Sequence, residues 1–437
     1  MALPKILIIN SVDPTVGPAE VALNFYKGFL HKGFDVDFLT KYPVLDYPEF
    51  ISVYKKKPDF FHRKWNWLIN KLKLSGRNIK YLPGSFFFYK KEDIPPVSVK
   101  AVIRKITKSY DVVYVVFWQE MLSFKTIEAI YQKLHCQIQF RCVDYSPMSG
   151  GCHFTGSCQK YKTGCGACPA IYSEDPNDFT SYNVKFRQRI YKEVKPIVYG
   201  NNYMQHFYRK SFLLKDYPRK ESVYPLVNNE IFHSYSLKKL RGIRHKYGYN
   251  DTDFVLFFGS QSLTDERKGI SYLLEALQIL YQNLSKQDRS RTKLILAGKN
   301  IEPIKSKLCF TYNYLGYVQR ERLTDIYNLS DAFICPSVND AGPTMVNQSL
   351  SCGTPVIAFE MGTAIDMVKG RNTGYCAALK DSKDLAHGIN YVMHLSKEKY
   401  EEMSKECRKV AMRLTSEKAF VDRFLEVYNK YKKEDKT

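Results

Sequence analysis

No apolar run in this chain approaches the ~18 residues needed to span a bilayer, so the sequence predicts no membrane-spanning helix. The first ten residues form an apolar stretch that is too short and too soon interrupted for a secretory signal peptide. We therefore expect a cytoplasmic protein whose 11 cysteines are reduced or metal-bound rather than paired in disulfides. Internal repeats and low-complexity tracts are also missing from the 437 residues.

Acidic residues are scarce relative to basic ones, 44 against 66, which leaves a formal charge of +22. Such an excess predicts an anionic partner: nucleic acid, an anionic membrane face or phosphorylated substrates. Between Tyr54 and Lys91, Asp59 is the only acid among eleven basic residues, and Trp65 and Trp67 stand in the same stretch. Basic and aromatic side chains together suit the headgroup level of an anionic bilayer. Stacking on single-stranded nucleic acid and an ordinary solvated face are the alternatives, and we favour membrane contact.

Strand and helix patterns alternate along the whole chain, which predicts α/β domains with parallel sheets. The length suits two domains of about 200 residues each, separated by a turn-rich segment at 225–250. In the first half we expect a helix over 19–32 and strands at 5–10, 34–40, 112–117, 137–142 and 196–200. In the second half we expect helices over 269–284 and 320–330 and strands at 254–259, 293–298, 332–337 and 355–359.

The most informative segment is 337–353, a Gly/Pro loop and helix start that lie between two apolar strands. A loop that opens a helix at the carboxyl end of a parallel strand aims backbone N–H groups at an anion, usually a phosphate. Asp340 lies on this loop and Gln348 lies two helical turns later. Both side chains can therefore face the same ligand.

A second loop of this kind, 259–269, follows the first strand of the second half. Arg267 and Lys268 stand at the helix start, where a planar guanidinium and a mobile ammonium can hold a diphosphate. A basic pair in this place is more often simply solvated. Two such loops at carboxyl ends of strands in one sheet, however, predict a single shared binding site.

Two segments of the first half are weaker candidates for the same site. Residues 10–20 form a strand-to-helix turn in which Gly17 permits a close backbone approach. Residues 144–153 carry Asp144 and His153 on either side of a Gly-Gly pair. Asp144 could instead cap a strand end, and His153 could be a metal ligand or a surface residue.

Four cysteines in the following Gly-rich stretch could hold a metal. They are Cys152, Cys158, Cys165 and Cys168. Four thiolates can close a tetrahedral zinc site, and the final Cys-x-x-Cys has the spacing of a metal knuckle. We expect a structural site there, with or without zinc, rather than a catalytic one.

The segment 337–353 resembles the nucleotide-sugar loop of the GT-B, family 4 glycosyltransferases of bacterial polysaccharide biosynthesis. In that family an acidic residue, seven further residues and a second acidic residue precede a CGTPV-like turn, and here the two positions read Asp340 and Gln348. Residues 267–269 resemble the family's diphosphate-binding helix start. Residues 17–20 resemble its Gly-Gly-Ala-Glu loop, with Pro18 for the second glycine, and 144–153 resembles its active-site segment, with Val143 in place of a histidine.

The resemblance implies two doubly wound, Rossmann-like domains that face each other across a cleft. We place them at 1–226 and 227–415, with a final helix at 416–437 that crosses back to the first domain. It further implies a retaining, metal-independent hexosyltransferase that needs no cofactor. Such an enzyme moves a sugar from a nucleotide-sugar donor to a polyprenyl-linked or saccharide acceptor in surface polysaccharide biosynthesis, at the inner face of the cell membrane.

The family's functional residues then map onto this sequence as follows. Arg267 and Lys268 stabilise the departing diphosphate, Asp340 holds the donor sugar, Gln348 binds the ribose, and Asp144 lies in the active site. Donor binding as a whole is expected at Gly17, Gly259, Arg267, Lys268, Gly342, Pro343, Thr344 and Gln348.

Two other classes of function remain open. The departures at Val143 and Gln348 also fit a catalytically weak scaffold or partner subunit. A nucleic-acid-binding protein would use the basic aromatic stretch and the cysteine loop, but it explains neither the doubled α/β pattern nor the two phosphate-suited loops, so we expect no nucleic-acid partner. A nucleotide-sugar epimerase of the same fold is a minor variant.

Overall fold

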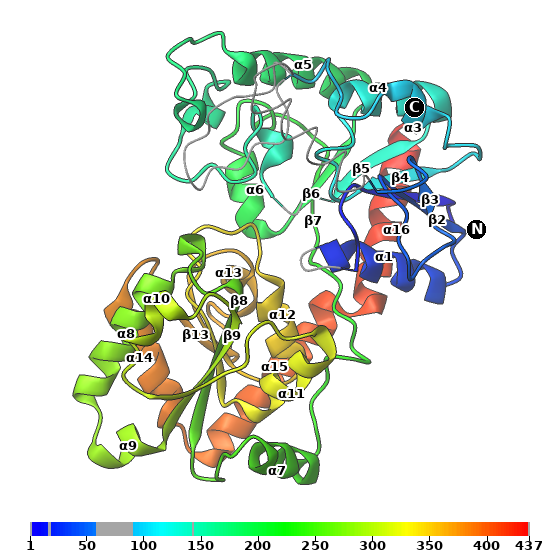
Figure 1. Cartoon of the computed structure of the whole chain (residues 1–437). Helices are drawn as coiled ribbons and strands as arrows, with labels where there is room; N and C mark the ends of the chain where they lie inside the picture. The colour runs from blue at the N-terminus through cyan, green and yellow to red at the C-terminus, as the bar shows by residue number, and fades with distance from the viewer. Residues whose placement is uncertain (1, 16–18, 58–90, 142–143, 436–437) are drawn as a thin grey trace. The chain divides into compact units, whose positions relative to one another are not determined.

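The structure is a computed structural model that describes residues 2–15, 19–57, 91–141 and 144–435 (Figure 1). It divides into two compact units. Unit 1 comprises Met1–Gly200, Met204–Val223 and Arg423–Thr437, and unit 2 comprises Asn201–Tyr203 and Tyr224–Asp422. No helix in the described part of the chain is long and apolar enough to cross a membrane.

Unit 1 is built on a seven-stranded parallel sheet in the order β3-β2-β1-β4-β5-β6-β7. Its central strands are short apolar runs buried on both faces, as expected for a parallel sheet covered by helices. The strands are β1 (Ile6–Asn10), β2 (Val36–Thr40), β3 (Ile51–Ser52), β4 (Val112–Val115), β5 (Gln137–Arg141), β6 (Ile197–Gly200) and β7 (Lys220–Ser222). The helices are α1 (Glu20–His31), α3 (Val99–Ile103), α4 (Phe124–Leu134), α5 (Phe179–Glu193) and α6 (Asn202–Tyr208).

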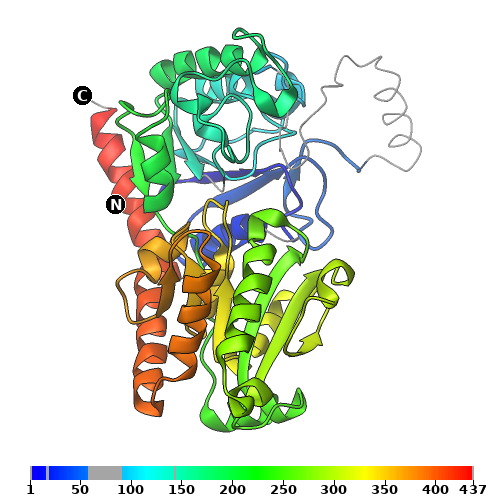
Figure 2. The ribbon, with the colours of Figure 1, turned by 90° about the vertical axis from the view of Figure 1, so that its left-hand side faces the viewer.

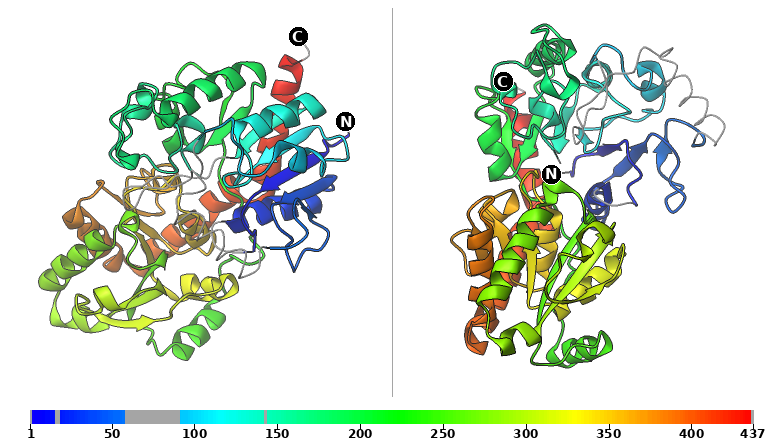
Figure 3. Two further views of the ribbon diagram at one scale, coloured as in Figure 1. Left: turned by 45° about the horizontal axis from the view of Figure 1, so that its top comes forward. Right: turned by 60° about the vertical axis from the view of Figure 1, so that its left-hand side comes forward.

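The last helix, α16 (Glu417–Glu434), places its C-terminal part in unit 1 (Figure 3). Phe424 packs against Phe29 of α1 with ring centroids 4.6 Å apart. The buried carboxylate of Glu221 accepts hydrogen bonds from Lys430 Nζ and Tyr431 OH, each at 2.7 Å. An apolar contact and a buried acid thus fix the end of the chain to the first sheet.

Unit 2 is built on a six-stranded parallel sheet in the order β10-β9-β8-β11-β12-β13. Its strands are β8 (Phe254–Ser262), β9 (Thr292–Lys299), β10 (Thr311–Tyr314), β11 (Ala332–Cys335), β12 (Val356–Phe359) and β13 (Gly374–Ala377). Its helices are α7 (Leu237–Lys246), α8 (Ile270–Asn283), α9 (Lys286–Arg291), α10 (Glu302–Lys305), α11 (Arg320–Leu329), α12 (Thr344–Ser351), α13 (Thr363–Met367), α14 (Ser382–Met393) and α15 (Lys397–Thr415).

Two apolar layers cover the faces of this second sheet. Helices α8 and α14 lie side by side on one face (Figure 2), and helices α11, α12 and α15 cover the other. Alternate residues of β8 serve the two layers: Val255 and Phe257 point to one, and Leu256 and Phe258 to the other. The predicted fold class, two doubly wound α/β domains, is confirmed.

Candidate functional site

The two predicted loops of unit 2 lie next to each other because β8 and β11 are neighbours in a parallel sheet. The backbone N–H of Val338 donates to the carbonyl of Arg267 at 2.8 Å. Gly269 has φ +70°, and a Cβ added there would lie 1.8 Å from the carbonyl oxygen of Pro336. Only glycine therefore allows the two loops to approach this closely.

Lys268 and Asp340 form an ion pair across these loops, with Nζ and Oδ2 2.5 Å apart. Burial disfavours the charged form of each group, but the opposite charge and the hydrogen bond of its partner more than offset this cost. The pKa of Lys268 is raised and the pKa of Asp340 is lowered from their ordinary values. The stability that charged Lys268 contributes is lost only as pH rises through its raised pKa. The stability that charged Asp340 contributes is lost only as pH falls through its lowered pKa. The pair is thus ionised throughout the neutral range.

Asp340 also fixes its own loop, since its Oδ1 accepts from the backbone N–H of Gly342 at 3.1 Å. Pro343 stands at the N-cap of α12 and has no side-chain oxygen to offer the first N–H groups of that helix. Thr344 begins the helix. The structure therefore brings Lys268, Asp340 and the 342–344 helix start together at the ends of β8 and β11, and their role as a binding site stays a prediction.

Arg267 is held differently from Lys268. Its Nη2 contacts Oδ2 of Asp265 at 2.7 Å, and Oδ1 of the same carboxylate accepts from the Arg267 backbone N–H at 3.1 Å. Asp265 caps the short 3-10 turn Glu266–Lys268 that carries both cations. Lys268 thus pairs with the second loop through its side chain, and the carbonyl of Arg267 accepts from the backbone N–H of Val338 on that loop.

Gln348 lies in α12, and its Oε1 accepts a hydrogen bond from the hydroxyl of Tyr327 at 3.1 Å. Tyr327 belongs to α11 and is fully buried. Gly259 allows α12 to pack closely against the end of β8, because a Cβ added there would lie 2.8 Å from Cε of Met345 in α12. Sequence reasoning missed Tyr327, which stands between Ile326 and Asn328 on α11 without any motif that marks a site.

In unit 1 the two ends of the segment 144–153 meet. Nδ1 of His153 contacts Oδ2 of Asp144, and the backbone N–H of Tyr145 donates to the carbonyl of His153 at 2.9 Å. Asp144 is buried and also accepts from Gln119 Nε2 at 3.2 Å and from the backbone N–H of Ser146 at 2.7 Å. A fixed carboxylate thus orients an imidazole, which is the arrangement of many acid–base sites. Gln119 was not foreseen from the sequence.

The four cysteines of the predicted metal loop are free thiols that line one cavity together with Gly150, Gly151 and Gly166. Burial raises the pKa of Cys165 to about 12 and also raises those of Cys152 and Cys168. Within the described residues, no three or more His, Cys, Asp or Glu side chains are grouped so that they could hold a metal ion. Zinc binding there stays a prediction, which elemental analysis of the purified protein can test.

Several predicted features lie outside the described residues. Gly17 and Val143 are among them, as are Trp65, Trp67 and most of the basic aromatic stretch. The roles of Gly17 and of the basic aromatic stretch stay predictions.

The chain resembles known glycosyltransferases in sequence. Residues 242–410, which contain both loops of unit 2, match the family described as glycosyl transferases group 1. An uncharacterized glycosyltransferase of Methanocaldococcus jannaschii is 24% identical over 151 residues, which are 33% of this chain and 36% of that protein. The putative glycosyltransferase EpsD of Bacillus subtilis is 22% identical over 210 residues, 47% of this chain and 53% of that protein. The chain thus spans about a third to a half of the length of these relatives.

Solved structures of similar fold cover nearly the whole chain. Sucrose-phosphate synthase from Thermosynechococcus elongatus aligns with a TM-score of 0.65 at 15% identity, over 98% of this chain and 99% of that one. A glycosyltransferase from Rickettsia africae gives 0.63 at 15% identity, over 98% of each chain. Anabaena HepE, in complex with UDP and glucose, gives 0.61 at 14% identity, over 98% of this chain and 100% of that one. These likenesses establish the GT-B fold.

Proposed function

We propose that this protein is a glycosyltransferase that moves a sugar from a nucleotide-sugar donor to an acceptor hydroxyl. The observation that carries the proposal is the Lys268–Asp340 pair, which joins two loops at neighbouring strand ends. Both loops lie inside the segment that matches the group 1 glycosyl transferases. The complex of HepE with UDP and glucose supports a nucleoside diphosphate sugar as the class of donor.

In this proposal the bond between the anomeric carbon and the diphosphate breaks while a bond to the acceptor oxygen forms. Negative charge builds up on the departing diphosphate, and the cations Lys268 and Arg267 stabilise it, so that the protein's own charges do the work of a divalent metal. Asp340 and the Gly342 loop hold the donor sugar, and Gln348 donates its amide to the ribose. We further propose that the anomeric configuration is retained.

On the acceptor side, we propose that Asp144 and His153 of unit 1 face the acceptor hydroxyl. The buried carboxylate holds the imidazole in one orientation, which suits a group that guides a proton away from an attacking oxygen. The proposed acceptor is a polyprenyl-linked or saccharide molecule of surface polysaccharide biosynthesis.

Product analysis tests this proposal. Purified protein is incubated with a panel of nucleotide sugars and short polyprenyl-linked or saccharide acceptors, and the mixtures are examined by mass spectrometry. We expect one donor to yield a glycosylated acceptor and free nucleoside diphosphate. Donor binding without transfer or hydrolysis on any acceptor would instead identify a catalytically inactive scaffold, and a donor that is neither bound nor consumed would contradict the proposal.

We also propose that the protein acts at an anionic membrane surface from the cytoplasmic side. The support is the charge of +22 and the basic aromatic stretch Tyr54–Lys91. Each lysine or arginine near an anionic membrane surface contributes only ~1 kcal/mol of binding, and salt screens this attraction. The protein should therefore sediment with anionic vesicles, be released as salt rises, and bind neutral vesicles weakly. Equal binding to both kinds of vesicle, or tighter binding to a single-stranded oligonucleotide, would argue against membrane contact.

A further inference from the structure

The loop between Asp144 and Cys152 is fastened to its surroundings through its own carbonyl groups. Five successive carbonyls, from Ser146 to Gly150, each accept a hydrogen bond from a side chain. The donors are Arg187 for Ser146 and Ser149, Tyr191 for Pro147 at 3.1 Å, Ser211 for Met148 at 3.5 Å, and Asn183 for Gly150 at 2.9 Å. A loop whose regular structure is limited to the short 3-10 turn Ser146–Met148 is thereby given a defined shape.

Three of these donors come from one stripe of a single helix. Asn183, Arg187 and Tyr191 are spaced by four residues in α5, so their side chains lie on the same face, one turn apart. All three are buried. The loop also lies tight against the start of this helix, because a Cβ added at Gly150 would lie 2.3 Å from the carbonyl oxygen of Thr180.

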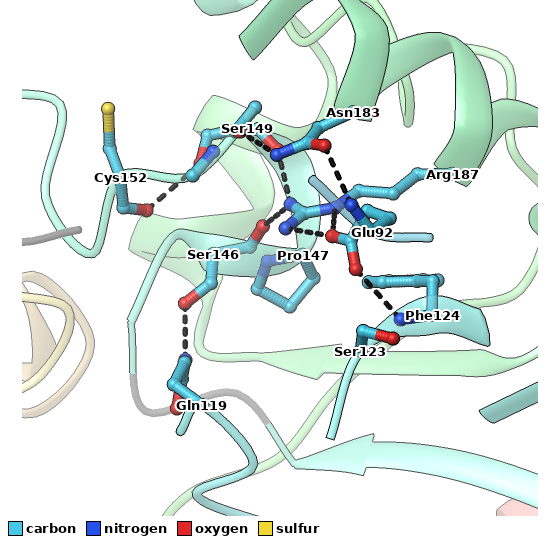
Figure 4. A network of polar contacts seen from close by, with 12 residues as sticks. Glu92, Gln119, Ser123, Phe124, Ser146, Pro147, Ser149, Cys152, Asn183 and Arg187 are labelled. Atoms are coloured by element: carbon cyan, nitrogen blue, oxygen red, sulfur yellow. Dashed lines mark hydrogen bonds and ion pairs between the residues drawn. The ribbon is translucent and has the colours of Figure 1, made fainter. Parts of the chain in front are cut away.

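Arg187 is the centre of this arrangement (Figure 4). Its side chain and that of Glu92 are both 0% exposed, and Nε and Nη2 each lie 2.6 Å from Oε1 of Glu92. The other oxygen of Glu92 accepts from the backbone N–H of Phe124 at 2.8 Å, at the start of α4. The guanidinium carbon lies 4.9 Å from the centroid of the Phe124 ring. The cation is therefore paired, stacked and hydrogen-bonded, and its Nη1 reaches the loop.

The two residues whose carbonyls Arg187 binds also help to fix the Asp144–His153 pair. Ser146, whose carbonyl accepts from Arg187, donates its backbone N–H to Asp144 at 2.7 Å. Ser149, whose carbonyl accepts from the same Nη1, donates its hydroxyl to the carbonyl of Cys152 at 2.9 Å. Cys152 directly precedes His153. One guanidinium thus supports Asp144 through Ser146, and His153 through Ser149 and Cys152.

We infer that Arg187 is a positioning residue that holds the Asp144–His153 pair in its working geometry, an inference that rests on the proposed function. A buried ion pair is expensive to desolvate and is a poor source of stability compared with apolar packing. The planar guanidinium of an arginine, with its five N–H donors, can instead bind one carboxylate and two carbonyls at fixed angles. The ammonium of a lysine cannot do this. Geometry rather than stability therefore accounts for an arginine at this position.

The test is Arg187→Lys, which keeps the positive charge and loses the fork, with Arg189→Lys as the matched control. Arg189 lies on the exposed side of the same helix, 43% exposed, and pairs with Glu128 and Glu193. In Arg187→Lys we expect backbone amides of 144–153 to exchange hydrogen about tenfold faster or more, because their loop opens locally. We expect kcat to fall by roughly 10- to 100-fold, as small misplacements of reacting groups do.

Donor affinity should stay within about twofold of the wild-type value, since the donor loops belong to unit 2. Arg189→Lys should change neither exchange nor kcat. If Arg187→Lys does not fold, Tyr191→Phe replaces it, because this change removes only the hydroxyl that donates to the carbonyl of Pro147. It should speed hydrogen exchange of the 144–153 amides and lower kcat, each by roughly threefold or more.

The outcomes separate the two proposals. Wild-type protein that transfers sugar, together with an Arg187→Lys variant of unchanged kcat, would overturn the positioning role and leave the proposed function intact. A kcat loss without faster exchange in 144–153, or an equal loss in Arg189→Lys, would overturn it as well. Wild-type protein that is inactive on every donor and acceptor would remove the proposed function, and the positioning role with it.

Discussion

Replacing Arg267 and Lys268 together with alanine is expected to abolish nucleoside diphosphate binding. Hydrogen bonds to charged groups contribute roughly 1.5–3 kcal/mol each, so the double loss amounts to about 3–6 kcal/mol. Such a loss weakens a dissociation constant by roughly a hundredfold or more. Titration calorimetry with UDP, ADP and GDP measures it directly.

The structure refines this expectation for the single variants. Lys268 is paired to Asp340 on the second loop, and Arg267 is held by Asp265 within its own turn. Lys268→Ala removes a ligand and also leaves the carboxylate of Asp340 without its counter-charge, so it should cost more binding than Arg267→Ala. The Lys238→Ala, Lys239→Ala double variant in α7 removes the same charge elsewhere in unit 2 and serves as the control. Unchanged affinity in the Arg267, Lys268 variant, or an equal loss in the control, would remove the donor-site assignment.

Arg187→Met is expected to lower the free energy of unfolding of unit 1 by about 3–5 kcal/mol, because it leaves the carboxylate of Glu92 buried and uncompensated. Combining it with Glu92→Gln removes the stranded charge and should restore a large part of that loss. Thermal or urea unfolding of the full chain measures the effect. Since the chain has two units, the transition of unit 2 provides an internal reference that should not move.

Arg189→Met is the matched control for this second expectation. Its ion pairs with Glu128 and Glu193 are partly exposed, and exposed pairs contribute only about 0–1 kcal/mol. Destabilisation of equal size in the two variants would mean that the Arg187–Glu92 pair is no more important than a surface pair. Arg187 would then make no special contribution to stability, and the positioning role would still be decided by the experiment with Arg187→Lys.

The central strands of both sheets could be predicted from the sequence because most of them are buried apolar runs. Strands β1, β4 and β12 begin and end within one or two residues of the expected positions. The edge strands β3, β7, β10 and β13 were not predicted, and they carry little apolar signal: β3 has two residues, β7 reads KES and β10 reads TYNY. An edge strand is specified mainly by its pairing with a neighbour, and pairing is a tertiary property.

The sequence by itself determined the fold class and the two loops of unit 2, because strand, turn and helix-start signals are local and lie within a few residues of one another. Only the tertiary structure decided which side chains meet. Lys268 and Asp340 are 72 positions apart, and Arg187 meets Glu92 across 95 positions. From the sequence alone, a glutamate that is fully buried beside an arginine looks the same as one that is solvated. Contacts of this kind depend on how packed helices and loops bring distant residues together, which no local pattern encodes.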